Sequence, residues 1–386
     1  MVTKRKIIKY SINFLLVCLL LWSGLFLINH KIQKTETRSD FKSRWVTYHW
    51  EDGRISIGKA LEKAGASKVI SVDWQSEKHL PSPSKSISQK EIHKTLAVSL
   101  KAKASAKENN AILKKAFDFA RKHPGTDLIF PKGHFKLGTL TPDKDYQVLP
   151  SHTSLIGRQT TLLISGSEYW LGLPSGPKAE DGVSDFRMTG LHFKAQNLVK
   201  GDKLLIMVDH GKDWFISHNR FTLVHQKGSH VFDLGSLQNS RFSENEFYGY
   251  APGLDSQELF KKGQNLHDFY AEAIQLDAAD PNGVWDAGII KSIQANNHLY
   301  NQTRFLCNGI SIDHNHFLPY KNEKGNIIAY GASIGQHSSK VGQVSIRHNV
   351  FENCIVSQFS PVKSWVLAPI HVLSDQLDSF NNVFKE

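Results

Sequence analysis

The chain has 386 residues, of which 40% are hydrophobic and 22% charged, an ordinary globular composition. Its formal net charge of +11 would suit a nucleic-acid-binding protein, but residues 1–50 hold nine Lys and Arg against two Asp and Glu, which leaves 38 against 34 elsewhere. Because positive residues beside an apolar N-terminal segment are explained by membrane orientation and anionic lipids, the charge argues against nucleic-acid binding.

The apolar segment is Ile12 to Ile28, and four basic residues precede it: Lys4, Arg5, Lys6 and Lys9. Seventeen residues at about 1.5 Å each come close to spanning a bilayer core of about 30 Å. No small-x-small cleavage site follows, so residues 1–30 predict an uncleaved signal-anchor with the remainder outside the cytoplasm. The protein would then be a single-pass cell-membrane protein, or a secreted one if the segment is instead a cleaved signal peptide.

Residues 31–103 predict a polar stalk, a small cap containing a strand-like Val69–Val72, and a Ser- and Lys-rich linker. Two cysteines lie beyond the anchor, Cys307 and Cys354. They form a disulfide or remain packed thiols, and their number alone does not decide between the two.

Order returns with an amphipathic helix over Asn110–Lys122, in which Ile112, Leu113, Ala116, Phe117 and Ala120 recur at helical spacing. Pro124 and Gly125 end it. A strand over Asp127–Phe130 follows, and then a Pro-x-Gly-x-Phe turn over Pro131–Phe135.

An internal repeat dominates the rest of the chain: a strand ending in Asn-x-Phe, mostly at spacings of 26 to 34 residues. In this repeat Asn suits a left-handed turn and a ladder of amides, and the following Phe packs under the next coil. The copies end at Phe221, Phe247, Phe317, Phe351 and Phe384, and Gly190–Phe193 is a degenerate copy.

The helix, the strand, the Pro-x-Gly-x-Phe turn and this repeat together resemble the pectate-lyase-like superfamily of right-handed parallel β-helices, over residues 104–386. The resemblance implies an all-β solenoid whose open end is capped by the helix, since an uncovered end would be an exposed sheet edge. It also implies chemistry of the polysaccharide lyase or glycoside hydrolase type, although one fold hosts many chemistries.

A second strand precedes each repeat strand, and the second strands align by inward apolar pairs such as Ile206/Val208, Phe232/Leu234 and Ile274/Leu276. Strand alternation then points the intervening residues outward. One outward column reads Met207, Asp233, Gln275, Gly335, His371, and the next reads Asp209, Gly235, Asp277, His337, Leu373. His230 and Glu272 belong to a third column, at the start of the strands.

This exposed face is the predicted site. It carries Asp, Glu, Gln and His rather than a mixed polar set, and neighbouring carboxylates separate each other's pKa values into an acid and a base. We assign catalysis to Asp277, Asp233, Glu272 and His337, and substrate binding to Asp209, His230, Gln275, Tyr270, Trp285 and His371. The aromatic pair would stack on sugar rings from flanking loops. The alternatives are a merely polar sheet face and a Ca²⁺ site; no other cofactor is indicated.

The sequence therefore predicts an enzyme that cleaves glycosidic bonds of an extracellular polysaccharide. Hydrolysis is favoured slightly over elimination, because the aligned columns contain no Lys or Arg to neutralise a uronate. A lyase or epimerase acting on a uronate polymer remains an alternative, as does a non-catalytic glycan-binding β-helix. The Asn-Thr-Asp, Gly-His-Gly and Arg-Ile-Lys motifs of polygalacturonase-like enzymes are absent from the sequence.

Overall fold

A computed structural model describes residues 47–48, 69–72, 94–142, 144–172, 182–199, 201–224, 230–249, 272–279, 305–335, 341–354, 358–359, 365–366, 370–372 and 374–385. Within these ranges no helix is both long and apolar enough to cross a membrane. The predicted anchor, Ile12–Ile28, lies outside them.

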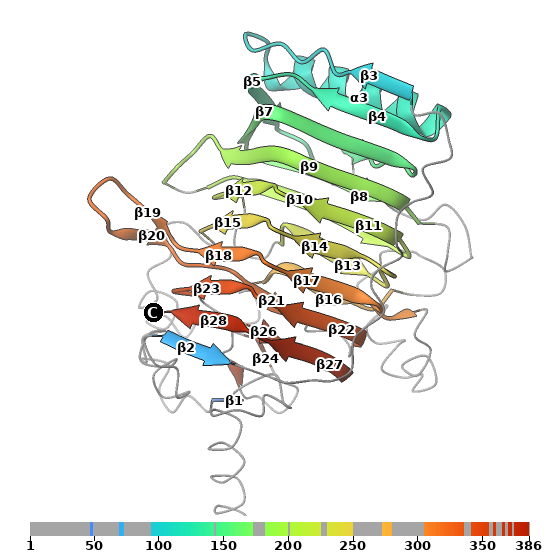
Figure 1. Cartoon of the computed structure of the whole chain (residues 1–386). Coiled ribbons are helices and arrows are strands. Elements are labelled where there is room, and N and C mark those ends of the chain that lie inside the picture. The colour runs from blue at the N-terminus through green and yellow to red at the C-terminus, as the bar shows by residue number, and fades with distance from the viewer. Residues whose placement is uncertain are drawn as a thin grey trace, which may run out of the picture.

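Two stacks of strands form the body of the protein (Figure 1). The seven-stranded sheet is parallel throughout. Its strands, in chain order, are β6 (Gln147–Val148), β8 (Ser167–Gly172), β10 (Lys203–Asp209), β13 (Phe232–Gly235), β16 (Glu272–Asp277), β21 (Ser333–Gly335) and β26 (Ile370–His371).

The sixteen-stranded sheet is also parallel, except where β2 joins it. Its strands are β2 (Val69–Val72), β3 (Lys94–Ala97), β4 (Thr126–Phe130), β5 (Gly133–Gly138), β7 (Thr153–Ser165), β9 (Ser184–Ala195), β11 (Lys212–Ser217), β12 (Arg220–Thr222), β14 (Arg241–Ser243), β15 (Glu246–Tyr248), β17 (Ile310–Asp313), β18 (His316–Leu318), β22 (Val341–Arg347), β23 (Val350–Glu352), β27 (Ser374–Phe380) and β28 (Asn382–Lys385).

The chain alternates between the two sheets: β10 is followed by β11 and β12, β13 by β14 and β15, and each element pairs in parallel with its counterpart one coil later. This is the connectivity of a parallel β-helix, so the parallel β-solenoid in the predicted fold class is confirmed. Two short antiparallel sheets stand apart from it. In one, β25 (Trp365–Val366) pairs with both β1 (Thr47–Tyr48) and β24 (Gln358–Phe359), and in the other β19 (Tyr320–Lys321) pairs with β20 (Ile327–Ala329).

One helix, α3 (Ala106–Lys122), packs on β4, β5 and β6 at one end of the solenoid (Figure 1). It begins earlier than the predicted Asn110 because Ser105 and Glu108 form a capping box that satisfies the first free N–H groups. Leu113 and Phe117 are fully buried, and the Phe117 ring meets Trp170 edge-on at 5.4 Å. At the other end β2 pairs antiparallel with β28.

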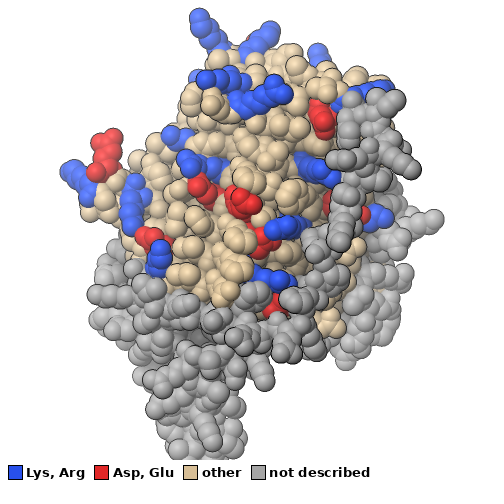
Figure 2. Space-filling model, in the orientation of Figure 1, with Lys and Arg blue, Asp and Glu red and all other residues tan. Residues whose placement is uncertain are grey.

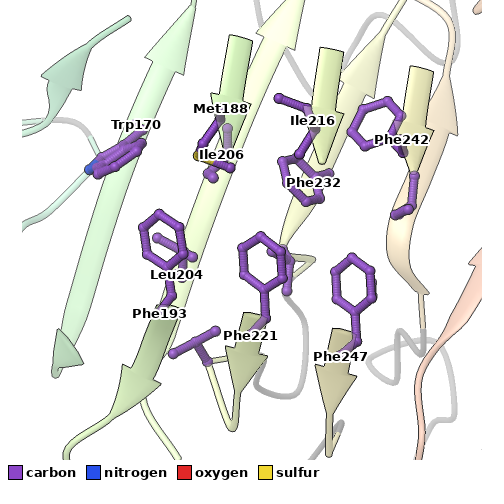
Figure 3. Close-up of a cluster of buried hydrophobic side chains, with 14 of the residues drawn as sticks. Trp170, Met188, Phe193, Leu204, Ile206, Ile216, Phe221, Phe232, Phe242 and Phe247 are labelled. Atoms are coloured by element: carbon purple, nitrogen blue, oxygen red, sulfur yellow. The ribbon is translucent and has the colours of Figure 1, made fainter. Parts of the chain in front are cut away.

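The Asn-x-Phe repeat builds two ladders inside the solenoid. The side-chain amide of Asn245 donates to Asn315 Oδ1 at 3.0 Å, Asn315 donates to Asn349 at 3.0 Å, and the pattern continues from Asn349 to Asn382. The ladder of rings is regular as well: Phe247 stacks on Phe317 with centroids 4.9 Å apart. Figure 3 shows Phe193, Phe221 and Phe247 in line, facing core residues from the opposite sheet.

The left-handed turn does not fall on the asparagine, as predicted, but on the residue before it. His218, Glu244, His314 and His348 all have φ between 54° and 58°. The Asn itself keeps its amide inside the solenoid, where it donates to backbone carbonyls and to the next Asn. For Asn315 these carbonyls belong to Phe242 and Asp313. Cys307 and Cys354 are both free and buried, so the thiols are packed rather than paired.

Candidate functional site

The strand register places the predicted columns side by side. Asp209 on β10 pairs with Gly235 on β13, which pairs with Asp277 on β16. In the neighbouring column Asp233 pairs with Gln275. The inward residues between them, such as Ile206, Phe232, Leu234, Ile274 and Leu276, are fully buried in the core. The alignment drawn from inward apolar pairs is therefore the register of the structure over these strands.

The predicted exposure of this face is wrong. Asp209 is only 5% exposed, Glu272 1%, His230 5% and Gln275 3%. Asp233 and Asp277 are half-buried. The alternation of residues along a strand predicts which side of the sheet a side chain faces. It does not predict whether other parts of the chain cover that side. Asp233 and Asp277 are thus the least buried of the described acids on this face.

Gly235 lies between Asp209 and Asp277 in the column and has no side chain that would separate them. A Cβ atom placed on it would lie 2.1 Å from Asp209 Oδ1, so the Asp209 carboxylate occupies the space that any other residue at position 235 would fill. Asp277 lies at the other side of the same glycine in the column. The missing side chain lets Asp209 extend toward Asp277, and this brings two negative groups together on a largely buried surface.

The electrostatic consequence is visible in two of the acids. Burial, together with the charge of Asp277, raises the pKa of Asp209 to about 7. Burial and the charges of Asp277, Asp209 and Glu272 raise the pKa of Asp233 well above its usual range, with Lys203 acting weakly in the opposite direction. The surroundings of Asp233 therefore favour its protonated form over the carboxylate. A carboxyl group with a raised pKa is what a general acid near neutral pH requires.

Asp277 is oriented by its own strand. The side-chain amide of Gln275 donates to Asp277 Oδ2, and the two residues point to the same side of β16. Gln275 Oε1 is buried without a hydrogen-bond partner among the described residues. From strand spacing and rise, the Cα atoms of Asp233 and Asp277 lie about 8 Å apart.

His230 and Glu272 form a buried pair beside these acids. His230 Nδ1 lies 2.9 Å from the backbone oxygen of Glu272 and 3.7 Å from its carboxylate Oε2. Since both side chains are almost fully buried, they hold the entrance of β16 in place and do not face a ligand directly.

Four other predicted residues are not tested by this geometry. His337, Tyr270 and Trp285 lie outside the described residues. His371 pairs with Gly335 through its backbone, as the column predicts, and its side chain is not described.

Two features of this face escaped the sequence analysis. An apolar cluster covers the face beside the acids, formed by Leu140, Tyr169, Leu171, Leu205 and Met207. The second feature is Lys203, which lies on the same side of β10 outside the aligned columns, with its ammonium 5.4 Å from the centre of the Tyr169 ring. The sequence of β10, Lys-Leu-Leu-Ile-Met-Val-Asp, indicates the apolar cluster, because a continuous run of apolar residues is typical of a strand that is buried on both faces.

Among the described residues, no three His, Cys, Asp or Glu side chains are arranged to hold a metal ion. Calcium remains a prediction from the sequence. The arrangement that the structure does describe is an acid, Asp233, and a neighbouring carboxylate, Asp277, on adjacent strands within a low-dielectric surface.

No protein-family model and no curated protein matches the chain. Solved structures with a similar shape include the surface adhesin PfbA of Streptococcus pneumoniae, at 16% identity and a TM-score of 0.46, matching 68% of this chain and 57% of that one. Another is the A-module of the Azotobacter vinelandii mannuronan C-5 epimerase AlgE6, at 12% identity, 65% and 58% coverage, and a TM-score of 0.33. An alginate lyase from Paenibacillus sp. str. FPU-7 matches at 9% identity, 76% and 98% coverage, and a TM-score of 0.26. This chain thus spans less than two thirds of the adhesin and epimerase chains.

Proposed function

We propose that the protein hydrolyses glycosidic bonds of a polysaccharide, with Asp233 as the general acid and Asp277 as the general base. The observation that carries the proposal is the pair itself: two half-buried carboxyl groups on adjacent strands, one of which has a strongly raised pKa. A single acidic pair in two protonation states is the minimum machinery of glycoside hydrolysis.

Each step uses one member of the pair. Asp233, whose raised pKa favours the protonated carboxyl group, donates its proton to the glycosidic oxygen as the bond from that oxygen to the anomeric carbon breaks. Asp277 removes a proton from a water molecule whose oxygen forms the new bond to the anomeric carbon. The Cα separation of about 8 Å suits an inverting pair, in which the carboxyl groups stand about 6.5–9.5 Å apart to admit the water.

The buried neighbours act through these two groups. Asp209 and Glu272 add negative charge that keeps Asp233 protonated, and Gln275 holds Asp277 by donating its amide hydrogen to Oδ2. The apolar cluster beside Met207 lowers the local dielectric, which strengthens these effects. We class Asp209, Glu272, His230 and Gln275 as positioning residues.

Elimination is the weaker alternative for this face. A lyase must neutralise a uronate carboxylate, and the one cation described near the acids, Lys203, lies over the ring of Tyr169.

The test is to incubate the full-length chain in detergent with the surface or secreted polysaccharide of the producing cell. Hydrolysis predicts new reducing ends without ultraviolet absorption, and their loss in Asp277→Asn. Products with an absorbing, unsaturated end would replace hydrolysis by elimination. Retention of oligosaccharides without any new ends would establish binding alone.

We propose in addition that the solenoid works outside the cytoplasm, held at the cell membrane by Ile12–Ile28. The proposal rests on the apolar run, its basic flank and the missing cleavage site. In membrane fractionation without protease, the intact chain should remain in the membrane fraction. Protease added from outside the cell should then cut the chain beyond His30. Soluble protein with a new N-terminus would instead show a cleaved signal.

A further inference from the structure

The outer face of the sixteen-stranded sheet carries a group of basic side chains far from the acids in the fold. Two outward columns run across β5, β7, β9 and β12. One joins His134, Thr161, His192 and Arg220, and the other joins Lys136, Leu163, Lys194 and Thr222. We call His134, Lys136, His192, Lys194 and Arg220 the basic patch.

None of the positions that these four strands contribute to the two columns is Asp or Glu. The one acid on the four strands, Asp185 near the start of β9, lies outside the columns and contacts His152. The first acid in either column is Glu246 on the next strand, β15, and it is paired with Arg220 at 2.5 Å. Figure 2 shows this side of the molecule: blue basic atoms dominate its upper part, toward α3, and red acidic atoms join them lower down. The patch is therefore a local excess of positive charge.

The members of the patch lie close enough to affect one another. His192 is half-buried, with Nε2 3.0 Å from Thr222 Oγ1. Burial, followed by the charges of Arg220 and Lys194 and a smaller one from His134, lowers the pKa of His192 to about 4. His192 is thus neutral at pH 7, while Lys136, His134 and Arg220 are exposed around it. A neutral imidazole and a hydroxyl beside exposed cations offer both hydrogen bonds and charge to one ligand.

We propose that the basic patch is a second glycan-contact surface, which binds the carboxylate or sulfate groups of an anionic polysaccharide while the acids on the opposite sheet act on the same polymer. The proposal rests on the proposed function for the identity of that polymer. Charge complementarity argues for an anionic ligand, because the column that holds Lys136 and Lys194 has no Asp or Glu on these strands. Thr222, His192 and the Tyr248 ring, which lies 5.4 Å below the Arg220 guanidinium, suit the hydroxyls and faces of sugars.

The experiment measures binding without cleavage. The full-length chain carrying Asp277→Asn is titrated with polygalacturonate and with neutral dextran at about 50 mM salt and at several higher salt concentrations. We expect polygalacturonate alone to bind, with an affinity that falls as salt rises. Lys136→Glu and Lys194→Glu should each weaken it roughly tenfold at low salt. Lys324→Glu, the same change on the exposed turn between β19 and β20, should alter it less than about twofold.

Equal losses in Lys136→Glu and Lys324→Glu would overturn the proposal, as would equal binding of dextran. A double-stranded DNA that binds more tightly than polygalacturonate at equal charge concentration would also overturn it. Failure of the proposed function leaves a different signature, namely a wild-type chain that binds the polymer through the patch and never cuts it.

Discussion

The carboxylate of Asp209 lies where the side chain of Gly235 would be, one strand away in the same column, with Oδ1 only 2.1 Å from the position of a Cβ atom. The two residues are 26 positions apart in the chain. Their relationship shapes the site, because the glycine gives Asp209 room to extend toward Asp277.

Gly235→Ala should therefore disturb the acids directly. The new methyl group forces Asp209 out of its position, and we expect a loss of activity of about tenfold or more together with destabilisation of about 1–3 kcal/mol. A double-mutant cycle checks the cause: in an Asp209→Ala background the clash is absent, so Gly235→Ala should cost much less stability. Equal cost in the two backgrounds would show that Asp209 is not what the methyl group meets.

Asp277→Asn should preserve the fold and polysaccharide binding while reducing turnover by about 10²–10⁴-fold, because the amide no longer accepts a proton from water. Release of reducing ends and binding of the polymer are measured on the same preparation. Asp213→Asn is the matched control: it makes the same chemical change on β11 of the other sheet, at a left-handed position that Asn tolerates. Near-normal turnover in Asp277→Asn would remove the general base from the proposal.

The raised pKa of Asp209 predicts how stability depends on pH. In the unfolded chain Asp209 ionises near pH 3.9, whereas in the folded protein its pKa is about 7. Between these values the folded state binds more protons, so the free energy of unfolding falls as pH rises, by up to about 1.4 kcal/mol per pH unit. Asp233 contributes in the same direction.

Asp209→Asn should remove that part of the slope. Chemical denaturation at about pH 4.5 and pH 7.5 should show the variant gaining stability over the wild type at the higher pH only. If the difference in unfolding free energy between Asp209→Asn and the wild type is the same at the two pH values, the pKa of Asp209 is not raised in the folded protein.

The asparagine ladder supplies a prediction about the fold alone. Asn315 is fully buried, and its Nδ2 group donates to the carbonyls of Phe242 and Asp313 and to Asn349 Oδ1. Asn315→Asp replaces the Nδ2 donor by a carboxylate oxygen, which then faces three hydrogen-bond acceptors and no donor in its place. We expect at least about 3 kcal/mol of destabilisation at neutral pH, measured by denaturant unfolding. Asn326→Asp, on the exposed β20 side of the hairpin, should change stability by less than about 0.5 kcal/mol.

Much of the architecture follows from periodicity in the sequence. Each Asn-x-Phe copy places one amide and one ring inside the solenoid, and copies one coil apart stack because parallel strands repeat at about 4.8 Å. The same regularity aligns Asp209, Gly235 and Asp277 from the sequence alone, since this register buries the inward pairs Ile206/Val208 and Ile274/Leu276 together.

Periodicity is a property of single strands, and it does not record what packs over a sheet. The burial of Asp209 and Glu272, the apolar cluster around Met207 and the place of Lys203 near Asp233 all depend on contacts between distant segments. The same holds for the basic patch, whose members come from three strands between residues 134 and 220. The sequence alone determined which residues share a column, whereas tertiary contacts decided how far each is removed from water and which charges it meets, and these two quantities set its pKa.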